Sequence, residues 1–594
     1  MEFRQSVYDN AKQITDGCMG YEEAFCTAAC PMHTDVKKYI RQIGEGNVEG
    51  AMETIREKLF LPNTLGRICA HPCEAACRRE SEFGQPLSVA ALKRYAAEKA
   101  DEKTSWDTTT GEDTGKSVAV IGAGPAGAQA AIDLRKAGHR AVIYDKLNVV
   151  GGMMRVGIPE YRLPREVIDF EYSYLEDLGV EFKMGVEIGK DITFTDLRAQ
   201  HDAVIVANGA HKGGVPPVKG KEAQGVTNAC DFLKEVSLTR QSETAGKRIA
   251  VVGGGDVAMD CARSAWRIGA EEVSLLTLES FDELPASKEE IHESMEEDVR
   301  FLNSWGTDEI IADETGRVQT IRLKKVLSVF DENGKFAPQF GEETMEIEAD
   351  TVIFATGQQV EDVTGGLIEQ KGGGRYVTNP ETLATSEDDV FVAGDASGGY
   401  IVVEAMALGK KAAKSADRFL NQQELEEGRN FKYEYSFVTN LDVPLPKGTE
   451  NLPRQSGNHR AAEERKHDFR PYDLGYTDEQ AKQEASRCLQ CECKLCMEEC
   501  LMMNDYGECP QDIFGQFLQD GEIEPIVPYS CNVCGGCTHV CPNDYPIGET
   551  FMAMRKDFIL HNDGKSPMEG HKAIEMHQKL GFSKVFTTKV KGGK

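Results

Sequence analysis

Apolar positions follow three different patterns along this chain of 594 residues. Up to about residue 100 they recur every three or four positions, which predicts amphipathic helices such as VKKYIRQI and VEGAMETIREKLF. From Lys116 to about Leu420, short β-branched runs alternate with helical stretches, a pattern typical of parallel α/β domains. Residues 421–485 are polar, with prolines at positions 444, 446, 453 and 471, and predict a long linker or surface wrap.

Composition and charge narrow the class of protein. The chain is 40% hydrophobic and 28% charged, which is typical of a soluble protein of several domains. No apolar run approaches the roughly eighteen residues of a membrane span, and the polar start MEFRQSVYDN is no secretory signal, so we expect a cytoplasmic protein. The net charge of −31 argues against nucleic acid and anionic membranes as partners.

The 18 cysteines gather near the two ends of the chain. Six precede Gly84, ten follow Arg487, and only Cys230 and Cys261 lie between. In a cytosolic chain such clusters indicate metal rather than disulfides. The run SCNVCGGCTHVCP has the C-x2-C-x2-C-x3-C-P spacing that binds [4Fe-4S] cubes in bacterial ferredoxins, and ten cysteines in this order favour iron over a four-ligand zinc site.

All sixteen cysteines of the two end regions are therefore predicted iron ligands. They are Cys18, Cys26, Cys30, Cys69, Cys73, Cys77, Cys488, Cys491, Cys493, Cys496, Cys500, Cys509, Cys531, Cys534, Cys537 and Cys541. In two-cluster ferredoxins the cysteine before proline binds the other cube. We therefore assign one cube to Cys531, Cys534 and Cys537, with Cys500 or Cys509 as its fourth ligand. Cys541 then closes the second cube with three of Cys488, Cys491, Cys493 and Cys496.

A first glycine-rich loop, SVAVIGAGPAGAQAA, follows a strand and opens a helix. Gly122, Gly124 and Gly127 form G-x-G-x-x-G, in which the glycines allow a tight turn, a close approach to a pyrophosphate, and packing of helix on strand. Asp145 ends the next strand, where a ribose hydroxyl is expected. The same loop and strand end add Pro125, Ala126 and Lys146 to the predicted site.

A second loop of the same kind, RIAVVGGGDVAMDCARSA, implies a second dinucleotide. Gly253, Gly255 and Ala258 form G-x-G-x-x-A after the strand IAVV, and the next strand ends near Glu279. The intervening Asp256 and Val257 belong to this predicted site.

Two later segments distinguish the dinucleotides. VFVAGDASGGYIVVEA places Asp395 after a strand, as in two-dinucleotide flavoproteins, where such an Asp receives the ribitol or pyrophosphate region of FAD. DTVIFATGQ marks the return from an inserted nicotinamide domain to the FAD domain. The first loop is therefore expected to bind FAD and the second the nicotinamide nucleotide. The remaining predicted cofactor contacts are Gly152, Arg155, Gly209, Gly394, Val402, Ala355, Thr356 and Gly357.

Three stretches carry a family resemblance. GGMMRVGIPEYRLP, VVGGGDVAMDCARSA and VFVAGDASGGYIVVEAMALG resemble the small subunit of glutamate synthase and its relatives, over about Tyr21 to Leu420. These relatives include the amino-terminal part of dihydropyrimidine dehydrogenase and the large subunit of the bifurcating NADH-dependent ferredoxin:NADP oxidoreductase. The resemblance implies oxidation of NAD(P)H with FAD, electron transfer through iron–sulfur clusters, and no catalytic acid or base.

The amino-terminal cysteines depart from the family pattern of two cubes. The first segment keeps three cysteines at altered spacing, and GRICAHPCEAAC has three rather than five residues between Cys69 and Cys73. The family's glutamine or glutamate ligand falls near Lys93 or Arg94, neither of which binds iron as a cation. We expect one cube here, while a second needs a non-cysteine ligand, for which His33 and His71 are candidates.

The end of the second nucleotide strand is another departure. NADPH-using members carry Tyr-Arg-Arg where this chain has Thr277, Leu278 and Glu279. A carboxylate there repels a 2′-phosphate and accepts the 2′-hydroxyl of NADH, so NADH is expected and NADPH is less favoured. Three other cations are near enough in sequence to reach a phosphate and weaken the preference: Arg263, Arg267 and Lys288.

Together these features predict an α/β protein with two Rossmann-like dinucleotide-binding domains flanked by iron–sulfur domains. The expected domains are a helical iron–sulfur domain (1–115), an FAD domain in two parts (116–215 and 356–420) around an NAD-binding domain (216–355), a linker (421–485) and a ferredoxin-like domain with two [4Fe-4S] clusters (486–594). Three or four clusters are expected in all.

The predicted function is that of an NADH:acceptor oxidoreductase, in which electrons pass from NADH to FAD and through the clusters to a redox protein, in either direction. The tail IGETFMAMRKDFILHNDG resembles helical-ferredoxin segments of heterodisulfide-reductase-like subunits, and the overall plan resembles the flavoprotein that serves dissimilatory sulfite reductase. A sulfite-reductase-like protein, a heterodisulfide-reductase-like protein and a ferredoxin are the candidate partners. A non-catalytic or bifurcating subunit of a larger complex, an NADPH-dependent glutamate synthase small subunit, and a homodimer stay open.

Overall fold

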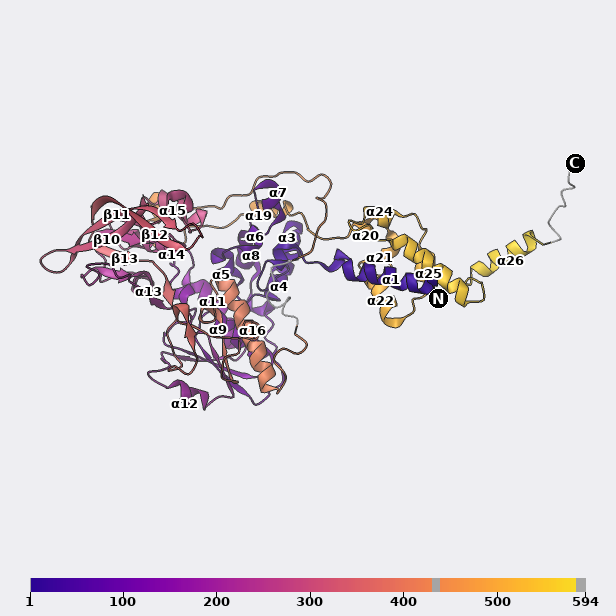
Figure 1. The fold of residues 1–594 in the computed structure, drawn as a ribbon, viewed down its shortest axis with the longest axis horizontal. Helices are drawn as coiled ribbons and strands as arrows, with labels where there is room; N and C mark the ends of the chain where they lie inside the picture. The colour runs from indigo at the N-terminus through magenta and orange to yellow at the C-terminus, as the bar shows by residue number, and fades with distance from the viewer. Residues whose placement is uncertain (1, 430–438, 584–594) are drawn as a thin grey trace. The chain divides into compact units, whose positions relative to one another are not determined.

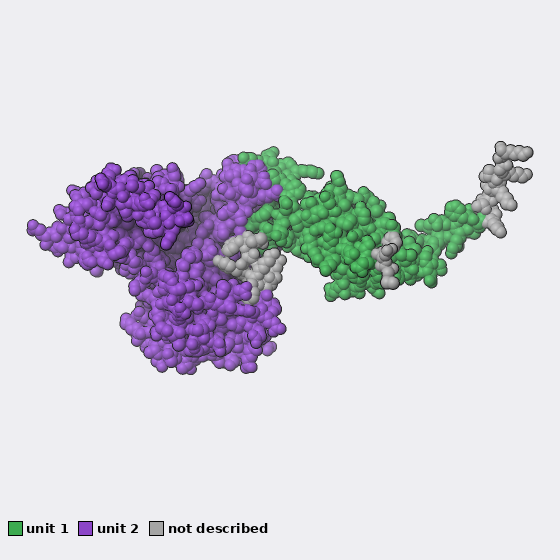
Figure 2. Space-filling model, viewed as in Figure 1, with its two compact units in different colours: residues 1–28, 438–451, 489–594 green, residues 29–437, 452–488 purple. Residues whose placement is uncertain are grey.

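The computed structural model describes residues 2–429 and 439–583, which form two compact units (Figures 1 and 2). Unit 1 comprises residues 1–28, 438–451 and 489–594, and unit 2 comprises residues 29–437 and 452–488. This grouping differs from the predicted split into a domain over 1–115 and another over 486–594, because the first helix packs with helices of the last hundred residues.

The first sheet of unit 2 is fully parallel, with strand order β17-β4-β1-β2-β3. Its strands are β1 (Ser117–Ile121), β2 (Arg140–Asp145), β3 (Glu181–Met184), β4 (Ala203–Val206) and β17 (Val390–Val392). β4 and β17 are buried along their whole length, as expected of parallel strands covered on both faces. The helices α9 (Pro125–Lys136) and α16 (Val402–Leu420) pack against each other and against this sheet, as Figure 1 shows.

Helices between the strands complete this part of unit 2. They are α10 (Met153–Val156), α11 (Arg165–Asp177) and α12 (Phe194–Arg198). β17 joins the sheet almost two hundred residues after β4, and the chain between them includes an inserted domain.

The insertion contains a second parallel sheet, with strand order β6-β13-β7-β8-β9. Its elements are β6 (Val226–Asn228), α13 (Ala229–Thr239), β7 (Arg248–Val252), α14 (Asp256–Arg267), β8 (Glu272–Thr277), α15 (Lys288–Glu296), β9 (Arg300–Asn303) and β13 (Thr351–Phe354). The prediction of two Rossmann-like domains, one inserted in the other, is thereby confirmed.

Shorter sheets accompany the insertion. Three antiparallel strands, β10 (Trp305–Ala312), β11 (Val318–Phe330) and β12 (Phe336–Glu348), lie between β9 and β13 in sequence. Two-stranded ribbons join β5 (Lys212–Gly213) to β14 (Gln358–Gln359), and β15 (Gln370–Lys371) to β16 (Arg375–Tyr376).

The amino-terminal part of unit 2 is helical, as predicted. It contains α3 (Val36–Glu45), α4 (Val48–Arg56), α5 (Pro62–Ile68), α6 (Pro72–Ala75), α7 (Arg78–Phe83) and α8 (Val89–Ala100). The side chain of Asp35 caps α3 by accepting a hydrogen bond from the Lys38 amide at 3.0 Å, and Gly46 ends the helix at a φ of 82°.

Residues 452–488 pack on unit 2, whereas polarity predicted a linker or a surface wrap over residues 421–485. This segment holds α18 (Ala462–Arg465) and α19 (Asp478–Ser486), and α19 packs against α3 and α8. Its buried carboxylate, Glu484, accepts backbone hydrogen bonds from Ser88 and Gln455, both at 2.8 Å. The segment is therefore an integral part of unit 2.

Helices are the regular secondary structure of unit 1 in its described residues. Its helices are α1 (Glu2–Gly17), α2 (Phe25–Ala28), α20 (Leu495–Glu499), α21 (Leu501–Asn504), α22 (Pro510–Asp520), α23 (Ile526–Ser530), α24 (Gly536–Val540), α25 (Ile547–His561) and α26 (His571–Gly581). Val7, Ala11 and Ile14 of α1 are fully buried in one core with Phe514 of α22 and Phe551 of α25. No helix among the described residues is long and apolar enough to cross a membrane.

Candidate functional site

The first glycine loop has the conformation that its sequence predicts. Gly122 has a φ of 113°, and a methyl group there would clash with the carbonyl oxygen of Ala207. A methyl group on Gly127 would clash with the carbonyl oxygen of Gly122. Gly124 caps α9, whose first residue is Pro125, so free amides at the helix N-terminus face the turn. The loop is built for a close approach of phosphate to backbone.

Asp145, at the end of β2, is held beside this loop by backbone amides. Its two carboxylate oxygens accept hydrogen bonds from the amides of Ala123 and Leu147, both at 2.7 Å. Burial raises the pKa of Asp145, and these two amides oppose the rise. Lys146 forms a 2.6 Å ion pair with Glu361. The acidic strand end is thus fixed where a ribose would lie.

Two adjoining cavities lie beside the first glycine loop. One runs along the carboxyl end of the first sheet and reaches the insertion, and the other lies around the end of β2. The predicted cofactor contacts that line one or both of them are Gly122, Gly124, Pro125, Ala126, Asp145, Lys146, Gly152, Gly209, Val257, Gly394, Asp395 and Val402. A dinucleotide in a parallel sheet of this kind binds at the carboxyl ends of the strands, so these cavities are the candidate FAD site.

Two titratable side chains face the candidate FAD site with shifted pKa values. Burial raises the pKa of Asp395 to about 6, although Arg375 opposes the shift. Burial and the nearby Lys146 and Lys234 lower the pKa of His211 to about 4, so His211 is neutral at pH 7.

Some predicted contacts lie outside these cavities. The guanidinium of Arg155 pairs with Asp169 and donates a 2.8 Å hydrogen bond to the carbonyl of Val150. Gly127 packs beneath the loop rather than lining it. Thr356 and Gly357 follow β13, and Ala355 packs against the second glycine loop.

The second glycine loop repeats the first in the inserted domain. Gly253 has a φ of 145°, and a methyl group there would lie 2.6 Å from the carbonyl oxygen of Ala355. Gly255 caps α14, on which Ala258 is fully buried. The carboxylate of Asp256 accepts a hydrogen bond from the Ser287 amide at 2.8 Å, which ties the loop to the segment before α15.

Glu279 reaches this second loop. A methyl group placed on Gly254 would lie 3.1 Å from Oε2 of Glu279, so the carboxylate lies against the glycine turn. The backbone of Glu279 is fixed, because its carbonyl oxygen accepts hydrogen bonds from the Ser304 amide at 2.9 Å and from the Thr277 hydroxyl at 3.0 Å. A ribose bound at this turn would meet a carboxylate.

Arg263 and Arg267, which the sequence made candidate partners of a 2′-phosphate, are buried in ion pairs instead. Arg263 contacts Glu290 at 2.8 Å and Glu297 at 2.9 Å, and Arg267 contacts Glu297 at 2.6 Å. Both arginine side chains are 0% exposed. Burial alone would raise the pKa of Glu297, but Arg267 and Arg263 lower it to about 2. The expectation that these arginines reach a phosphate is therefore wrong, and only Lys288, which is exposed, stays a candidate.

Residues that the sequence did not single out also line the candidate FAD site. Met154, Asn208 and Tyr400 line it from the first sheet's side, and Cys230 and Asp260 from the inserted domain. Arg162 holds the Asp260 carboxylate through bonds of 2.8 and 2.9 Å. The three stretches that carry the family resemblance contain Met154, Arg162, Asp260 and Tyr400 and were the sequence signal for them.

No disulfide joins any of the 18 cysteines, all of which lie in the described residues, and eight of the eleven in unit 1 form two groups. Cys537 is buried, Cys534 is exposed, and Cys531 accepts a hydrogen bond from the Val533 amide at 3.3 Å. Burial raises the pKa of Cys537, and the neighbouring thiols Cys500 and Cys531 raise it further. This places Cys500, rather than Cys509, beside the Cys531, Cys534 and Cys537 group.

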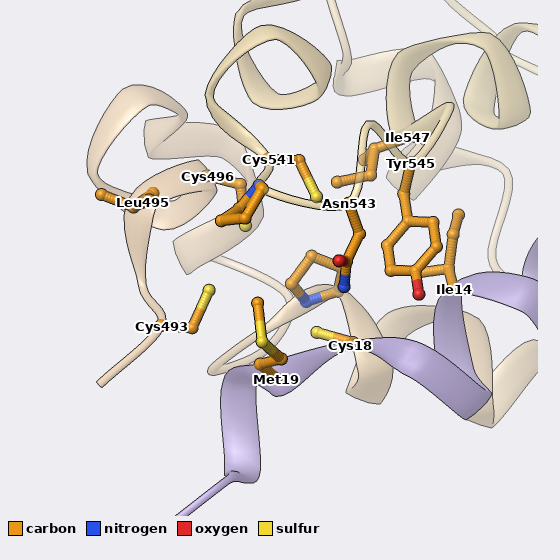
Figure 3. A pocket seen from close by; sticks show the side chains of 12 residues that line it. Ile14, Cys18, Met19, Cys493, Leu495, Cys496, Cys541, Asn543, Tyr545 and Ile547 are labelled. Atoms are coloured by element: carbon orange, nitrogen blue, oxygen red, sulfur yellow. The ribbon is translucent and has the colours of Figure 1, made fainter. Parts of the chain in front are cut away.

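The second group of unit 1 surrounds a small cavity (Figure 3). Cys493, Cys496 and Cys541, which are among the candidates for the second cube, line it, and the fourth thiol at the cavity is Cys18, from the end of α1. Cys491 does not line this cavity; it packs near Met19 and Leu441.

Five of the predicted cluster cysteines lie in unit 2, in two groups. Burial raises the pKa of both Cys69 and Cys73, Cys30 raises both further, and Lys93 lowers both, so these four side chains are neighbours. Arg94 is committed elsewhere, to Glu98 and Asp473.

The second group of predicted cluster cysteines in unit 2 lies around Arg79. Burial and Arg487 lower the pKa of Arg79, whereas Cys77 and Cys488 raise it, so both thiols lie within electrostatic reach of it. Cys488, predicted in the carboxyl-terminal cubes, thus lies in unit 2 near Cys77. Cys26, the remaining amino-terminal ligand candidate, belongs to unit 1.

The thiol sets fit iron–sulfur cubes by their chemistry. A cube binds each cysteine to a different iron, so its thiolates stand farther apart than the ligands of one zinc ion. Within residues 2–429 and 439–583, no three His, Cys, Asp or Glu side chains gather tightly enough to hold a single ion.

Comparison with known proteins shows that three family models match separate parts of the chain. The family described as pyridine nucleotide-disulphide oxidoreductase matches residues 116–416. The dihydropyrimidine dehydrogenase domain II, 4Fe-4S cluster family matches residues 2–105, and the 4Fe-4S dicluster domain family matches residues 487–546.

Three relatives align with this chain over most of their own length. The NADP(+)-dependent formate dehydrogenase subunit beta of Moorella thermoacetica is 35% identical over 78% of this chain and 70% of its own. The NADPH-Fe(3+) oxidoreductase subunit beta of Geobacter sulfurreducens is 32% identical over 78% of this chain and 75% of its own. The glutamate synthase [NADPH] small chain of Escherichia coli is 31% identical over 68% of this chain and 90% of its own.

Proposed function

We propose that this chain, which belongs to the pyridine nucleotide-disulphide oxidoreductase family and within it to the relatives of the glutamate synthase small chain, is an NADH:acceptor oxidoreductase. It is a flavin- and iron–sulfur-containing pyridine nucleotide oxidoreductase. FAD bound in the candidate site would supply the exchange between hydride and single electrons. What the chain's residues add is the choice of nucleotide and the route of the electrons.

The observation that carries the NADH assignment is the position of the Glu279 carboxylate against Gly254. A carboxylate at this place in a dinucleotide loop accepts the 2′-hydroxyl of a ribose and repels a 2′-phosphate. The arginines of the following helix, Arg263 and Arg267, are enclosed with Glu290 and Glu297. Neither is free to turn toward the loop without leaving a buried carboxylate unpaired.

The size of the preference follows from the missing arginine fork. A charge-assisted bidentate pair contributes on the order of 2–3 kcal/mol, and like-charge approach to Glu279 adds to its loss. Each 1.4 kcal/mol is about tenfold, so we expect NADH to be preferred by roughly 30-fold or more. The three relatives are named for NADP or NADPH, which makes this preference a property in which the present chain departs from them.

The test is the ratio of kcat/KM for NADH to that for NADPH, with a dye as acceptor. A ratio well above ten supports the assignment, and a ratio near one or below it contradicts it. The Lys288→Ala variant is the matched control, because Lys288 is the exposed cation near the loop. If Lys288 binds no phosphate, the variant keeps the wild-type ratio.

Bleaching of the flavin by NADH in the isolated protein separates this function from its main rival. An oxidoreductase bleaches on mixing, whereas a non-catalytic wiring subunit with a vestigial nucleotide site keeps its oxidised flavin spectrum. Both loops have their glycine-specific geometry, at Gly122 and at Gly253, which supports the catalytic reading.

We further propose that electrons leave through the cube held by Cys500, Cys531, Cys534 and Cys537. Cys534 is exposed, and Leu501, next to Cys500, is 84% exposed, so a partner can approach this cube closely. Two relatives are named as beta subunits and one as a small chain, which supports a redox protein as the partner rather than a small molecule. With the unit 2 cysteines, the chain would carry three or four clusters, in a reducing compartment such as the cytoplasm.

The exit is tested with the double variant Cys534→Ala and Cys537→Ala. It should keep flavin bleaching by NADH and lose transfer to a protein acceptor such as ferredoxin. Because cluster loss can unfold the surrounding helices, monodisperse protein with full flavin absorbance is required for the comparison. Undiminished transfer would move the exit to the unit 2 cysteines.

A further inference from the structure

We propose that Cys18, at the end of α1, is the fourth ligand of the cube held by Cys493, Cys496 and Cys541. The inference deepens the proposed function and rests on it in one respect, namely that the region around residues 487–546 holds two cubes. It joins an amino-terminal residue to a cluster that the sequence assigns to the carboxyl-terminal region alone.

The spacing of the carboxyl-terminal cysteines leaves this cube one thiol short. In the run C-x2-C-x2-C-x3-C, the first three cysteines bind one cube and the fourth binds the other. Cys493, Cys496 and Cys500 fit its second to fourth positions, and the first position falls on Gln490. The Cys531 run is complete, so only the cube closed by Cys541 lacks a ligand.

The structure supplies a thiol at this gap. Cys18, Cys493, Cys496 and Cys541 line one cavity, and Figure 3 shows their sulfur atoms turned toward its centre from three segments of the chain, one of which carries both Cys493 and Cys496. Cys491, one residue from the missing position, is absent from that lining. Four thiols around one cavity are the donor set of an all-cysteine cube.

Cys18 is held in place by the packing of α1. Val7, Ala11 and Ile14 fix the helix in the core of unit 1. The residues that follow are tied down as well, since Asn543 donates a 3.1 Å hydrogen bond to the carbonyl of Gly17, and Tyr21 donates one of 2.5 Å to Asp512. A ligand presented so rigidly needs little reorganisation to bind iron.

Cys509, the other thiol near Cys18, is assigned a different role from that of an iron ligand. It is fully buried, does not line the cavity, and caps α22 by accepting a hydrogen bond from the Asp512 amide. A methyl group on Gly20 would lie 2.7 Å from the Cys509 sulfur and 3.4 Å from the Cys18 sulfur, so both sulfurs converge on this glycine. We assign Cys509 as a hydrogen-bond donor to the Cys18 sulfur. When iron binds, Cys18 loses its thiol proton to solvent and forms one Fe–S bond, while Cys509 stays protonated.

The experiment compares full-length Cys18→Ala and Cys509→Ala after anaerobic reconstitution. Iron and acid-labile sulfide are counted per flavin, and EPR spectra of the reduced proteins are recorded. Cys18→Ala should lose one cube's iron and one EPR signal. Cys509→Ala should keep its iron and shift only the midpoint potential downward, because hydrogen bonds to ligand sulfurs tune cluster potentials.

Other outcomes overturn the assignment. Full iron in Cys18→Ala shows that Cys18 is no ligand, and loss of a cube from Cys509→Ala transfers the role to Cys509. The EPR signal of the Cys531, Cys534 and Cys537 cube serves as the folding control, since it requires an intact unit 1. Cys18→Ser is the second variant if this signal is lost; a serine ligand keeps the iron and alters the spectrum. Flavin bleaching by NADH, measured on the same samples, tests the proposed function independently of the iron count.

Discussion

The two glycine loops of unit 2 share one backbone design and differ in what surrounds them. Gly122 and Gly253 both have positive φ values, of 113° and 145°, and each loop is capped by a glycine that opens a helix. Beside the first loop, Asp145 has both carboxylate oxygens bound by backbone amides. Beside the second, the Glu279 side chain lies against Gly254 on a fixed backbone.

The difference fits the proposed function, in which one nucleotide would be resident and the other would exchange. The first loop opens into cavities that continue along the sheet and would enclose a dinucleotide. Glu279 is half-buried and its longer side chain is directed at the glycine turn, which suits a nucleotide that enters and leaves. The same fold thus supports retention at one loop and selection at the other.

The largest expected effect comes from adding a single methyl group to one or the other glycine loop. Gly122→Ala forces a clash with the Ala207 carbonyl at a φ that alanine rarely adopts, so the protein should be essentially free of flavin. Gly253→Ala should keep its flavin and lose reduction by NADH. Flavin absorbance after gel filtration measures how much flavin each variant keeps, and bleaching by NADH then measures flavin reduction. A flavin-free Gly253→Ala protein would show that the loops are not independent.

The next effect concerns selection at the second loop. Replacing Leu278 and Glu279 by arginine should introduce a fork for the 2′-phosphate and remove the opposing carboxylate. The ratio of kcat/KM for NADH to that for NADPH should fall by about 100- to 1000-fold, if each change contributes about 1.4–2 kcal/mol. The order of the two nucleotides should reverse. An unchanged ratio would mean that the ribose does not lie at the end of β8.

A matched pair of neutral substitutions compares the two carboxylates. In Asp145→Asn, an amide nitrogen replaces one acceptor of a backbone N–H, which costs about 1–3 kcal/mol and weakens FAD binding roughly 10- to 100-fold. In Glu279→Gln, the remaining carbonyl oxygen still accepts a ribose hydroxyl, so KM for NADH should change less than about tenfold. Flavin titration of the apoprotein and steady-state kinetics measure the two. Equal losses at both positions would remove the distinction between retention and selection.

The last effect is a pH dependence at Asp395. Its folded-state pKa of about 6 lies above the ordinary value of 3.8, so its contribution to stability is full below pH 4 and is lost as the pH rises through 6. Asp395→Asn avoids this loss. The apoprotein variant should match the wild type near pH 4 and exceed it above pH 7 by up to about 2–3 kcal/mol. Urea denaturation of the apoproteins at the two pH values tests this, and a constant difference would contradict it.

Local patterns in the sequence predicted what local geometry decides. The strand–glycine–helix loops at Gly122 and Gly253, and the acidic strand ends at Asp145 and Glu279, depend on residues close in sequence. They therefore appear where the motif places them. The two parallel sheets follow from the same alternation of strands and helices.

Long-range placements were not predictable in this way. Polarity marked residues 421–485 as a linker or a surface wrap, because Arg465 and Glu484 give no sign in sequence of the carboxylates, arginines and amides that bury them. The order of cysteines likewise does not tell which thiols meet in space. Cys18 meets Cys541 and Cys488 lies near Cys77 because of how distant segments pack, which no spacing rule encodes.

Unit 1 is assembled from the first and the last residues of the chain, and this imposes an order on its biosynthesis. The apolar stripe Val7, Ala11 and Ile14 is synthesised some five hundred residues before its partners on α22 and α25. At about 5–20 residues per second, this interval is roughly half a minute to two minutes. Unit 2 can fold during this time, whereas the core of unit 1, and with it any cluster that the core holds, can form only after α22 and α25 have been synthesised.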